Sequence, residues 1–598
     1  MRRGVHFRQV NSAKSRTIPR PLWRAAIAVI FLTVSLQAVV RCEASSDGSP
    51  GRSAGGDSLS VLRVEDDLMV RWSCQPFQKT VLLTLDGGAE WKAMDEAYAT
   101  DPETQYYCVP RELQKGFFRT GSEELQEFPR LRIMMPGRFI SGLPTPIRVE
   151  VLRGDGCVDW EVWEGEIALA ISPAHACSPA GPLVVHNGIA SSLLSFSGSG
   201  KGSIRAEFGG ESAVKDIEWL EVLGEASVAG ELADAVTVWK PGDGVIHVTD
   251  DVTIPPGRLL RIYPDTIVLL DPKKSISVRG AIESLGTVEH PVLFAAADPD
   301  NPWGEISHAH TSSKSTYRGT FFIGGGDSPA AGHTDRGPVI RVSHAEIEFV
   351  HCNVVDNYGK GLYSSHGNLT FTHCLFSRSA MGMEVVDTNI AVDRCFFLEM
   401  PMGGDVGDND PLYLHGGGDM SVTNSIFAIG GDDGIDTLSS QPVIENCIVH
   451  GFLDKGITVY YGTTRIRNCL ITSNDYGISA KGDGTNVYAD KTTVVGNRCT
   501  LQSRDKYNVP DAVIKFYVTN SIFWGTEREI QTDYPLEDIS ITYSVVQGAE
   551  PFPGEGNITD DPLFLDPEHN NFRLDENSPC RGTGQDGVDM GVAYDDLP

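Results

Sequence analysis

Short acidic motifs recur about every 22 residues between residues 408 and 481. They are Asp408-Asn409-Asp410, Gly431-Asp432-Asp433, Leu453-Asp454-Lys455 and Asn474-Asp475-Tyr476. Carboxylates that lie close together repel one another, so one of them can keep its proton above its usual pKa. A protonated carboxyl beside an ionised one suits general acid–base catalysis, and carboxylate oxygens are also ligands for Ca²⁺. The motifs predict a polar site if the fold brings them together.

A repeat of strand-like segments surrounds these motifs. The Cys or Ser of each copy follows the previous one after 22, 21, 30, 22 and 22 residues; the copies are His351-Cys352-Asn353, His373-Cys374-Leu375, Arg394-Cys395-Phe396, Asn424-Ser425-Ile426, Asn446-Cys447-Ile448 and Asn468-Cys469-Leu470. A second strand copy begins near Gly361, Gly382, Pro411, Gly434, Gly456 and Gly477. A short-strand repeat of this period is typical of a solenoid whose coils bury their apolar faces against each other. The regular leucines of a leucine-rich repeat are missing.

The repeat predicts an all-β fold with a right-handed parallel β-helix over residues 236–548. Its start, "GVIHVTDDVTIPPG", resembles the opening coils of secreted parallel β-helices, and residues 549–598 resemble the C-terminal cap of exported β-helix proteins. Strands of adjacent coils stack about 4.8 Å apart, so equivalent residues form columns. We expect the repeated cysteines to form an interior column of small apolar side chains.

The N-terminal residues indicate export. Residues 1–24 carry seven basic side chains and no acidic one, and Ala25–Val40 is an uncharged apolar run. This layout predicts that residues 1–44 are a secretory signal peptide, or alternatively an uncleaved membrane anchor. Residues 45–60 read as a linker. The protein is expected to be secreted or to lie in the cell envelope.

Alternating strands with Gly and Pro punctuation predict β-sandwich modules at 61–143 and 144–235. The second segment, with "GEIALAISPAHACSPAGPLVVHNG", resembles bacterial immunoglobulin-like (Ig-like) repeats. Four cysteines in this region could form two disulfides in an exported protein, with three possible pairings, or could remain buried thiols. They are Cys74, Cys108, Cys157 and Cys177.

Stacking of the coils would gather several candidate site residues at one corner. The expected catalytic group is Asp410, Asp432, Asp433 and Lys455, and the expected substrate contacts are Lys481, Tyr413, Tyr460, Asp436 and His415. Asp432, Asp454 and Asp475 are the alternative ligands for Ca²⁺, the only cofactor that the sequence suggests. The same aspartates could instead be a turn ladder, since Asp is favoured at tight turns. The stretched loop 399–409 is expected to wall a groove beside them.

The order of these motifs resembles that of polygalacturonase-type glycoside hydrolases, which place N-T-D, G-D-D, G-H-G and R-x-K on successive coils. The resemblance implies that Asp410, Asp432 and Asp433 are catalytic carboxylates and that Lys481 contacts a substrate carboxylate. It covers residues 408–481 only. Lys455 stands where the family has histidine and Ser479 where it has arginine.

The net charge of the chain limits the classes of molecule that it can bind. Asp and Glu number 80 against 49 Lys and Arg, a net charge of −31, which argues against nucleic acid or an anionic membrane as a partner. The sequence therefore predicts an exported protein that binds or cleaves a polysaccharide or cell-surface glycan through an acidic groove at 408–481. As an enzyme it would be a hydrolase, or a Ca²⁺-assisted lyase with Lys455 or Lys481 as base. The alternative is a non-catalytic adhesin or a structural envelope protein.

Overall fold

The computed structural model describes residues 40–43, six strands between 58 and 124, and residues 128–598 with short gaps. The six strands are 58–64, 67–74, 78–85, 92–98, 103–109 and 117–124, and the gaps are 175, 179–180, 222–223, 403–407, 505–508 and 510–511. The predicted signal peptide or anchor lies outside the described residues except for 40–43. Within these ranges, no helix has the length and apolarity needed to cross a membrane.

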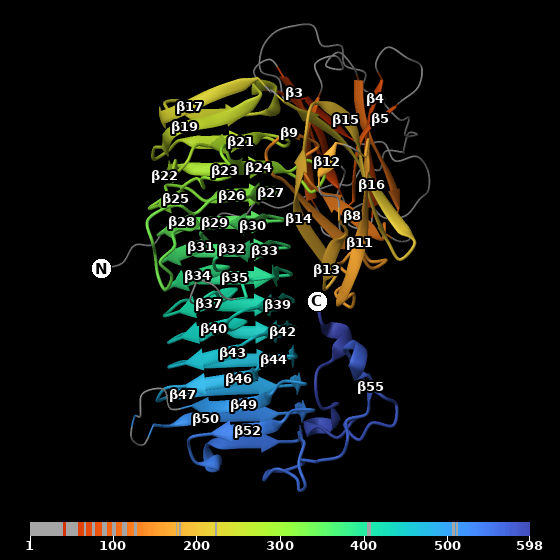
Figure 1. Cartoon of the computed structure of the whole chain (residues 1–598), viewed down its shortest axis with the longest axis vertical. Coiled ribbons are helices and arrows are strands. Elements are labelled where there is room, and N and C mark those ends of the chain that lie inside the picture. Colours follow the sequence, from red (N-terminus) through yellow and green to blue (C-terminus); the bar gives the residue numbers. More distant parts are fainter. Residues whose placement is uncertain are drawn as a thin grey trace, which may run out of the picture.

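The larger part of the chain is a parallel β-helix (Figure 1). A 25-stranded parallel sheet runs from β17 (Glu225–Glu231) to β54 (Val545–Val546), and a 13-stranded sheet runs from β18 (Val236–Trp239) to β53 (Ile539–Thr542). Each regular coil contributes two strands to the first sheet and one to the second. The solenoid predicted from the repeat is present, and its first strand, β17, precedes the expected start at residue 236.

The register of the second strands aligns the acidic motifs. β37 (Leu412–His415), β40 (Ile435–Leu438), β43 (Lys455–Tyr460) and β46 (Tyr476–Lys481) are consecutive neighbours in the sheet. Tyr413 pairs with Asp436, Asp436 with Thr458, and Thr458 with Ser479. Residues about 22 positions apart are thus side by side, as the columns required.

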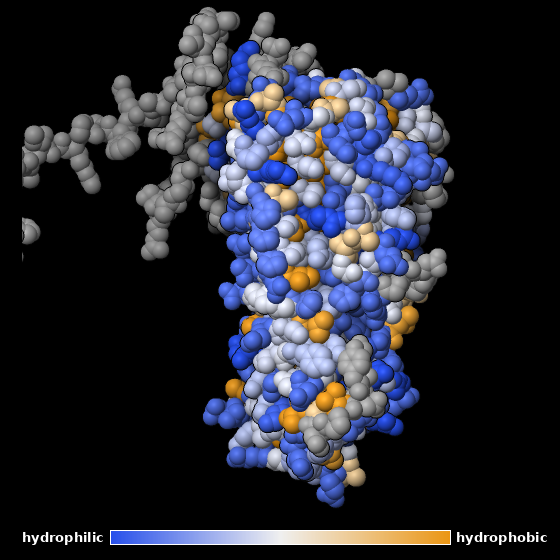
Figure 2. All heavy atoms as spheres, turned by 90° about the vertical axis from the view of Figure 1, so that its left-hand side faces the viewer, coloured by the Kyte–Doolittle hydropathy of each residue, from blue (hydrophilic) through white to orange (hydrophobic). Residues whose placement is uncertain are grey.

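Apolar columns fill the inside of the coils. Phe349 and Phe371 stack with their ring centroids 4.7 Å apart, and Phe397 and Phe427 stack at 4.6 Å. The repeated cysteines form the expected interior column, and each is at most 1% exposed: Cys352, Cys374, Cys395, Cys447 and Cys469. The outer face shown in Figure 2 is predominantly hydrophilic. The solenoid is therefore held together by stacked apolar side chains that neighbouring coils share.

Residues 131–220 form one curled sheet where an Ig-like sandwich was expected. Its nine strands follow the order β8-β10-β14-β13-β11-β15-β16-β9, with β12 paired to β14, and β11 (Glu164–Ser172) explains the curl. The first half of β11 pairs with β13 (Leu183–His186) and its second half with β15 (Gly200–Phe208), so one strand serves both sides of a half-barrel. Period-two patterning identifies strands but does not reveal such sharing. The boundary predicted at residue 143 falls inside this sheet.

The described strands before residue 125 form two small antiparallel sheets, of order β1-β2-β3-β6 and β5-β4-β7. β3 (Asp67–Cys74) and β6 (Glu103–Val109) are neighbours, but Cys108 pairs with Met69 and Cys74 pairs with Glu103. This register keeps the two thiols apart. All four cysteines that were candidates for disulfides are free in the structure, so no pairing among them is formed.

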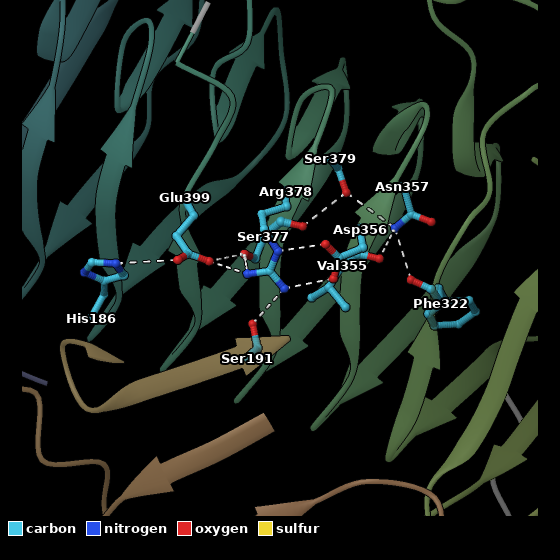
Figure 3. Close-up of polar contacts among 10 residues, drawn as sticks. All are labelled: His186, Ser191, Phe322, Val355, Asp356, Asn357, Ser377, Arg378, Ser379 and Glu399. Carbon is cyan, nitrogen blue, oxygen red and sulfur yellow. Dashed lines mark hydrogen bonds and ion pairs between the residues drawn. The ribbon is translucent and has the colours of Figure 1, made fainter. Parts of the chain in front are cut away.

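The half-barrel packs along the solenoid face formed by the first strands of the coils, and the two share a continuous apolar core. Arg378 of β33 (Leu375–Ser379) anchors this contact (Figure 3). It donates two hydrogen bonds to Asp356, at 2.7 and 2.8 Å, contacts Glu399, and donates to Ser191 Oγ of β14 (Ile189–Phe196) at 3.1 Å. One guanidinium thereby ties three coils to the half-barrel.

Arg378→Ala is expected to lower the free energy of unfolding by about 2 kcal/mol, because Asp356 and Glu399 would be left half-buried without their cation. Denaturant unfolding followed by tryptophan fluorescence measures the change. The control is Arg467→Ala, which removes an exposed pair with Glu445 at 3.4 Å and should cost less than about 0.5 kcal/mol. Equal shifts of the two variants would contradict the anchoring role.

Candidate active site

The acidic motifs lie at the corner where the first strand of a coil turns into the second. Asp410 precedes β37, Asp432 and Asp433 precede β40, and Lys455 begins β43. Asp410 Oδ1 accepts a hydrogen bond from the backbone N–H of Asp433 at 3.1 Å, and Asp433 Oδ1 accepts one from the N–H of Lys455 at 3.1 Å. Each carboxylate thus caps the backbone of the next coil, which fixes its position.

Three of the predicted carboxylates come together. Asp410, Asp432 and Asp433, called the acidic cluster below, each place an oxygen within 4.8 Å of the others. Asp410 and Asp433 are 3% exposed and Asp432 is half-buried. In the part of the chain that the structure describes, no other group of three potential metal ligands meets so closely. Asp432 is the member of the cluster that solvent reaches best.

Asp433 is the carboxylate with cationic and hydroxyl partners. Lys455 Nζ lies 2.9 Å from Asp433 Oδ1, and Thr458 Oγ1 donates to Asp433 Oδ2 at 2.6 Å. Lys455 also contacts Asp454. Burial alone would lower the pKa of Lys455, but the charges of Asp433 and Asp454 outweigh burial and raise it. Lys455 therefore stays protonated, which opposes the role of base that a lyase would need from it.

The remaining carboxylates hold protons more tightly than usual. Burial, followed by the charge of Asp433, raises the pKa of Asp432 to about 6 and that of Asp436 to about 8. Burial and the charge of Asp436 raise the pKa of Asp410 well above its usual value. Asp436 Oδ1 is buried and accepts no hydrogen bond. The corner thus combines one ion-paired carboxylate with neighbours that are neutral or partly protonated near pH 6 to 7.

A second polar network, which the sequence analysis did not identify, lies next to the cluster. Glu384 of β34 (Met383–Val386) is 1% exposed and contacts Lys360 Nζ at 2.5 Å and His333 Nδ1 at 3.0 Å. His333 Nε2 lies 3.1 Å from the hydroxyl of Tyr413. The hydrogen bond to Glu384 raises the pKa of His333, while burial opposes the rise.

One sequence feature could have revealed this network. Glu384 occupies the column of Tyr363, Tyr413 and Asp436, which the repeat itself defines. A carboxylate in that column, near a turn between coils, stood out as much as Asp436 did. His333 could not have been found in this way, because it belongs to an insertion outside the repeat.

The predicted substrate contacts have different surroundings. Tyr413 is 4% exposed, and the His333 ring packs against it edge-on at 4.2 Å, so its ring is not open for stacking on a sugar. Tyr460 stacks on Tyr461 at 4.3 Å. Lys481 is buried and pairs in register with Tyr460, and its charge opposes the rise in the pKa of Asp436. His415 is half-buried beside Tyr413, and the centroids of the two rings lie 6.1 Å apart.

The alternative calcium ligands do not form one group with Asp432. Asp454 contacts Lys455, and Asp475 pairs with Arg498, whose Nη2 lies 2.9 Å from Asp475 Oδ2. The acidic cluster itself offers oxygens, but Ca²⁺ takes six to eight of them, and both oxygens of Asp433 already accept hydrogen bonds. The arrangement fits acid–base chemistry better than a calcium centre.

The sequence of residues 339–497 matches the family model described as a right-handed beta helix region. This match agrees with the handedness that the repeat predicted. A search of curated protein sequences returned no significant match. The fold is thus a right-handed β-helix.

Several solved structures are similar at low sequence identity. The periplasmic alginate epimerase AlgG is 12% identical, with 52% of this chain and 78% of that chain covered and a TM-score of 0.36. A pectate lyase is 14% identical, with 55% and 87% covered and a TM-score of 0.27. An alginate lyase from Paenibacillus sp. is 14% identical, with 44% and 91% covered and a TM-score of 0.25.

Proposed function

We propose that the protein hydrolyses glycosidic bonds of a polysaccharide at the acidic cluster. The observation that carries this proposal is the meeting of Asp410, Asp432 and Asp433 within 4.8 Å, with Asp433 paired to Lys455 and the pKa of Asp432 raised to about 6. Two carboxyl groups with opposite protonation states are what cleavage of a glycosidic bond requires.

Each residue has a role in this proposal. Asp432, the most accessible carboxyl, donates its proton to the glycosidic oxygen as the bond to the anomeric carbon breaks. Asp433, held in its ion pair with Lys455, stabilises the positive charge that develops at that carbon, and water then attacks the carbon and returns a proton to Asp432. Lys455 and Thr458 hold Asp433 in place, and Asp410 fixes the backbone of the coil that carries both acids. Lys455 is thus a positioning residue rather than a base.

The charge of the site bears on the substrate. The net charge of −31 and the acidic cluster repel a bare polyanion, so an acidic polysaccharide would need Ca²⁺ to neutralise it, whereas a neutral glucan would not. Residues 1–44 are proposed to export the protein, as a cleaved signal peptide or as an anchor, and its substrate would then be a polysaccharide outside the cytoplasm.

A substrate panel tests the proposal. Purified protein is incubated with laminarin, polygalacturonate and alginate, with and without Ca²⁺, and assayed for new reducing ends and for unsaturated products that absorb in the ultraviolet. Reducing ends without ultraviolet absorbance support hydrolysis. Ultraviolet-absorbing products would replace it with a lyase reaction, and binding without turnover would replace it with the adhesin alternative.

The pH dependence of turnover follows from Asp432. A general acid must be protonated, so activity is expected to be maximal below about pH 6 and to fall about tenfold for each pH unit above it. Initial rates measured between pH 4.5 and 8 give the profile. Asp432→Asn should leave a low residual rate without this falling limb; an unchanged limb in that variant would assign the acid to another residue.

A further inference from the structure

An insertion rises at the same corner as the acidic cluster. Residues 323–337 connect β27 (Thr320–Phe322) to β28 (Pro338–Ser343), three coils before β37. In the intervening coils, the same corner is made by residues 358–359 and 380–382. The insertion is therefore an addition to a regular coil, and its length is available to reach along the solenoid.

Three successive coils hold residues 331–333, called the tip of the insertion below. Lys360 of β31 (Lys360–Ser365) donates a hydrogen bond to the carbonyl of Ala331. Glu384 of β34 accepts from the backbone N–H of His333 at 3.1 Å and binds its Nδ1, and Tyr413 of β37 binds its Nε2. A buried side chain from each coil is thus committed to fixing the insertion. The tip is thereby held against the second strands of these three coils.

The tip ends directly beside the proposed site. Tyr413 pairs in register with Asp436, and parallel strands lie about 4.8 Å apart. His333, which contacts Tyr413, therefore lies about one coil away from Asp436. Its pKa is raised partly by the charges of Asp408 and Asp436, which is consistent with this proximity. The insertion occupies the N-terminal side of the acidic cluster.

The other side of the cluster is built differently. In the following coils the same corner is made by residues 453–454, 473–475, 496–498 and 525–527. Connections of two or three residues cannot rise above the strands that they join. A long connection at this corner is found at 323–337, on the N-terminal side of Asp432 and Asp433, whereas residues 403–407 of the loop before β37 lie outside the described ranges. The corner is walled on one side of the cluster and low on the other.

We propose that the insertion 323–337 makes the site specific for the end of a polysaccharide chain, which enters from the C-terminal coils and stops at His333. This inference rests on the proposed function and adds the mode of attack to it. A chain bound through its interior would have to continue over the second strands of the Glu384 and Tyr413 coils, where residues 331–333 already lie.

The products distinguish the two modes. Attack at chain ends should release one short product from the first minutes, with little loss of viscosity for each new reducing end. The assay uses whichever polysaccharide of the panel is cleaved. A ladder of oligosaccharides with a rapid fall in viscosity would overturn the inference and leave hydrolysis itself intact.

Adding one carbon atom at Gly332 is expected to displace the tip of the insertion. Gly332 has φ +66°, and a Cβ there would lie 2.0 Å from Glu384 Oε1, so Gly332→Ala is expected to push the insertion away from the strands. The variant should raise the share of longer products at least threefold. Ala330→Ser, at an exposed position of the same insertion, is the matched control and should leave the pattern unchanged. If the insertion is released in Gly332→Ala and the product pattern stays unchanged, the insertion does not block the site, and the inference is wrong.

Two further measurements do not depend on turnover. Hydrogen exchange should show a protected backbone amide at His333, which donates to Glu384, and this protection should be lost in Gly332→Ala but not in Ala330→Ser; an unprotected His333 amide in the parent protein would overturn the inference. Binding to Asp433→Asn is measured with laminarin fractions of different length at equal mass. If the protein recognises chain ends, the amount of protein bound should be proportional to the number of polysaccharide chains, even if hydrolysis fails. Binding proportional to the total mass of sugar, whatever the chain length, would overturn the inference.

Discussion

Asp433→Asn is expected to lower kcat by about 10³-fold while KM changes less than about threefold. The amide matches the carboxylate in shape and can still accept the backbone N–H of Lys455, so the corner should keep its geometry. It carries no charge, and therefore cannot stabilise the cationic transition state that the proposal assigns to Asp433. Steady-state kinetics on the cleaved polysaccharide, with circular dichroism to verify folding, measure the effect.

Asp475→Asn is the matched control. Asp475 lies two coils after Asp432, at the same position of the repeated motif. Its carboxylate pairs with Arg498 on the surface. Loss of that exposed pair should leave kcat within about twofold of the parent protein. If both variants lose activity equally, the aspartates act as a structural ladder of the turns. Full activity in Asp433→Asn would remove the acidic cluster from the reaction.

The acidic cluster could be predicted from the sequence because a solenoid converts spacing into proximity. Once the period of about 22 residues is recognised, parallel pairing alone places Asp410 beside Asp433 and Asp433 beside Lys455. The same rule places Tyr413 beside Asp436 and predicts the interior cysteine column. No knowledge of side-chain packing is needed for these neighbours, only the register of the strands.

Contacts made by segments outside the repeat could not be predicted in that way. His333 meets Glu384 across 51 residues because an irregular insertion folds back over three coils, and no period links the two positions. Arg378 reaches Ser191 across 187 residues because a separate sheet docks on the solenoid. The role of Lys455 also changed, since its pairing with both Asp433 and Asp454 follows from side-chain geometry rather than from order along the chain.

The buried pair of Lys360 and Glu384 carries the largest expected effect on stability. Both side chains are at most 1% exposed, and Glu384 keeps its charge because the hydrogen bond from His333 and the charge of Lys360 outweigh its burial and lower its pKa. Glu384→Leu would leave the ammonium of Lys360 buried without its carboxylate. The expected loss is about 3–5 kcal/mol in the free energy of unfolding, measured by denaturant titration.

Restoring neutrality should recover much of that loss. In the double variant Lys360→Met with Glu384→Leu, no charge is left buried, so it should be more stable than either single variant, and the coupling between the two changes should reach at least about 1.5 kcal/mol. Additive effects would show that the two groups do not stabilise each other. The double variant should still lose hydrogen-exchange protection at the His333 amide, because Glu384, which accepts its hydrogen bond, and Lys360, which binds Ala331, are both replaced. This result would show that apolar side chains can replace the pair in stabilising the solenoid. It would also show that they cannot replace the pair in holding the insertion in place.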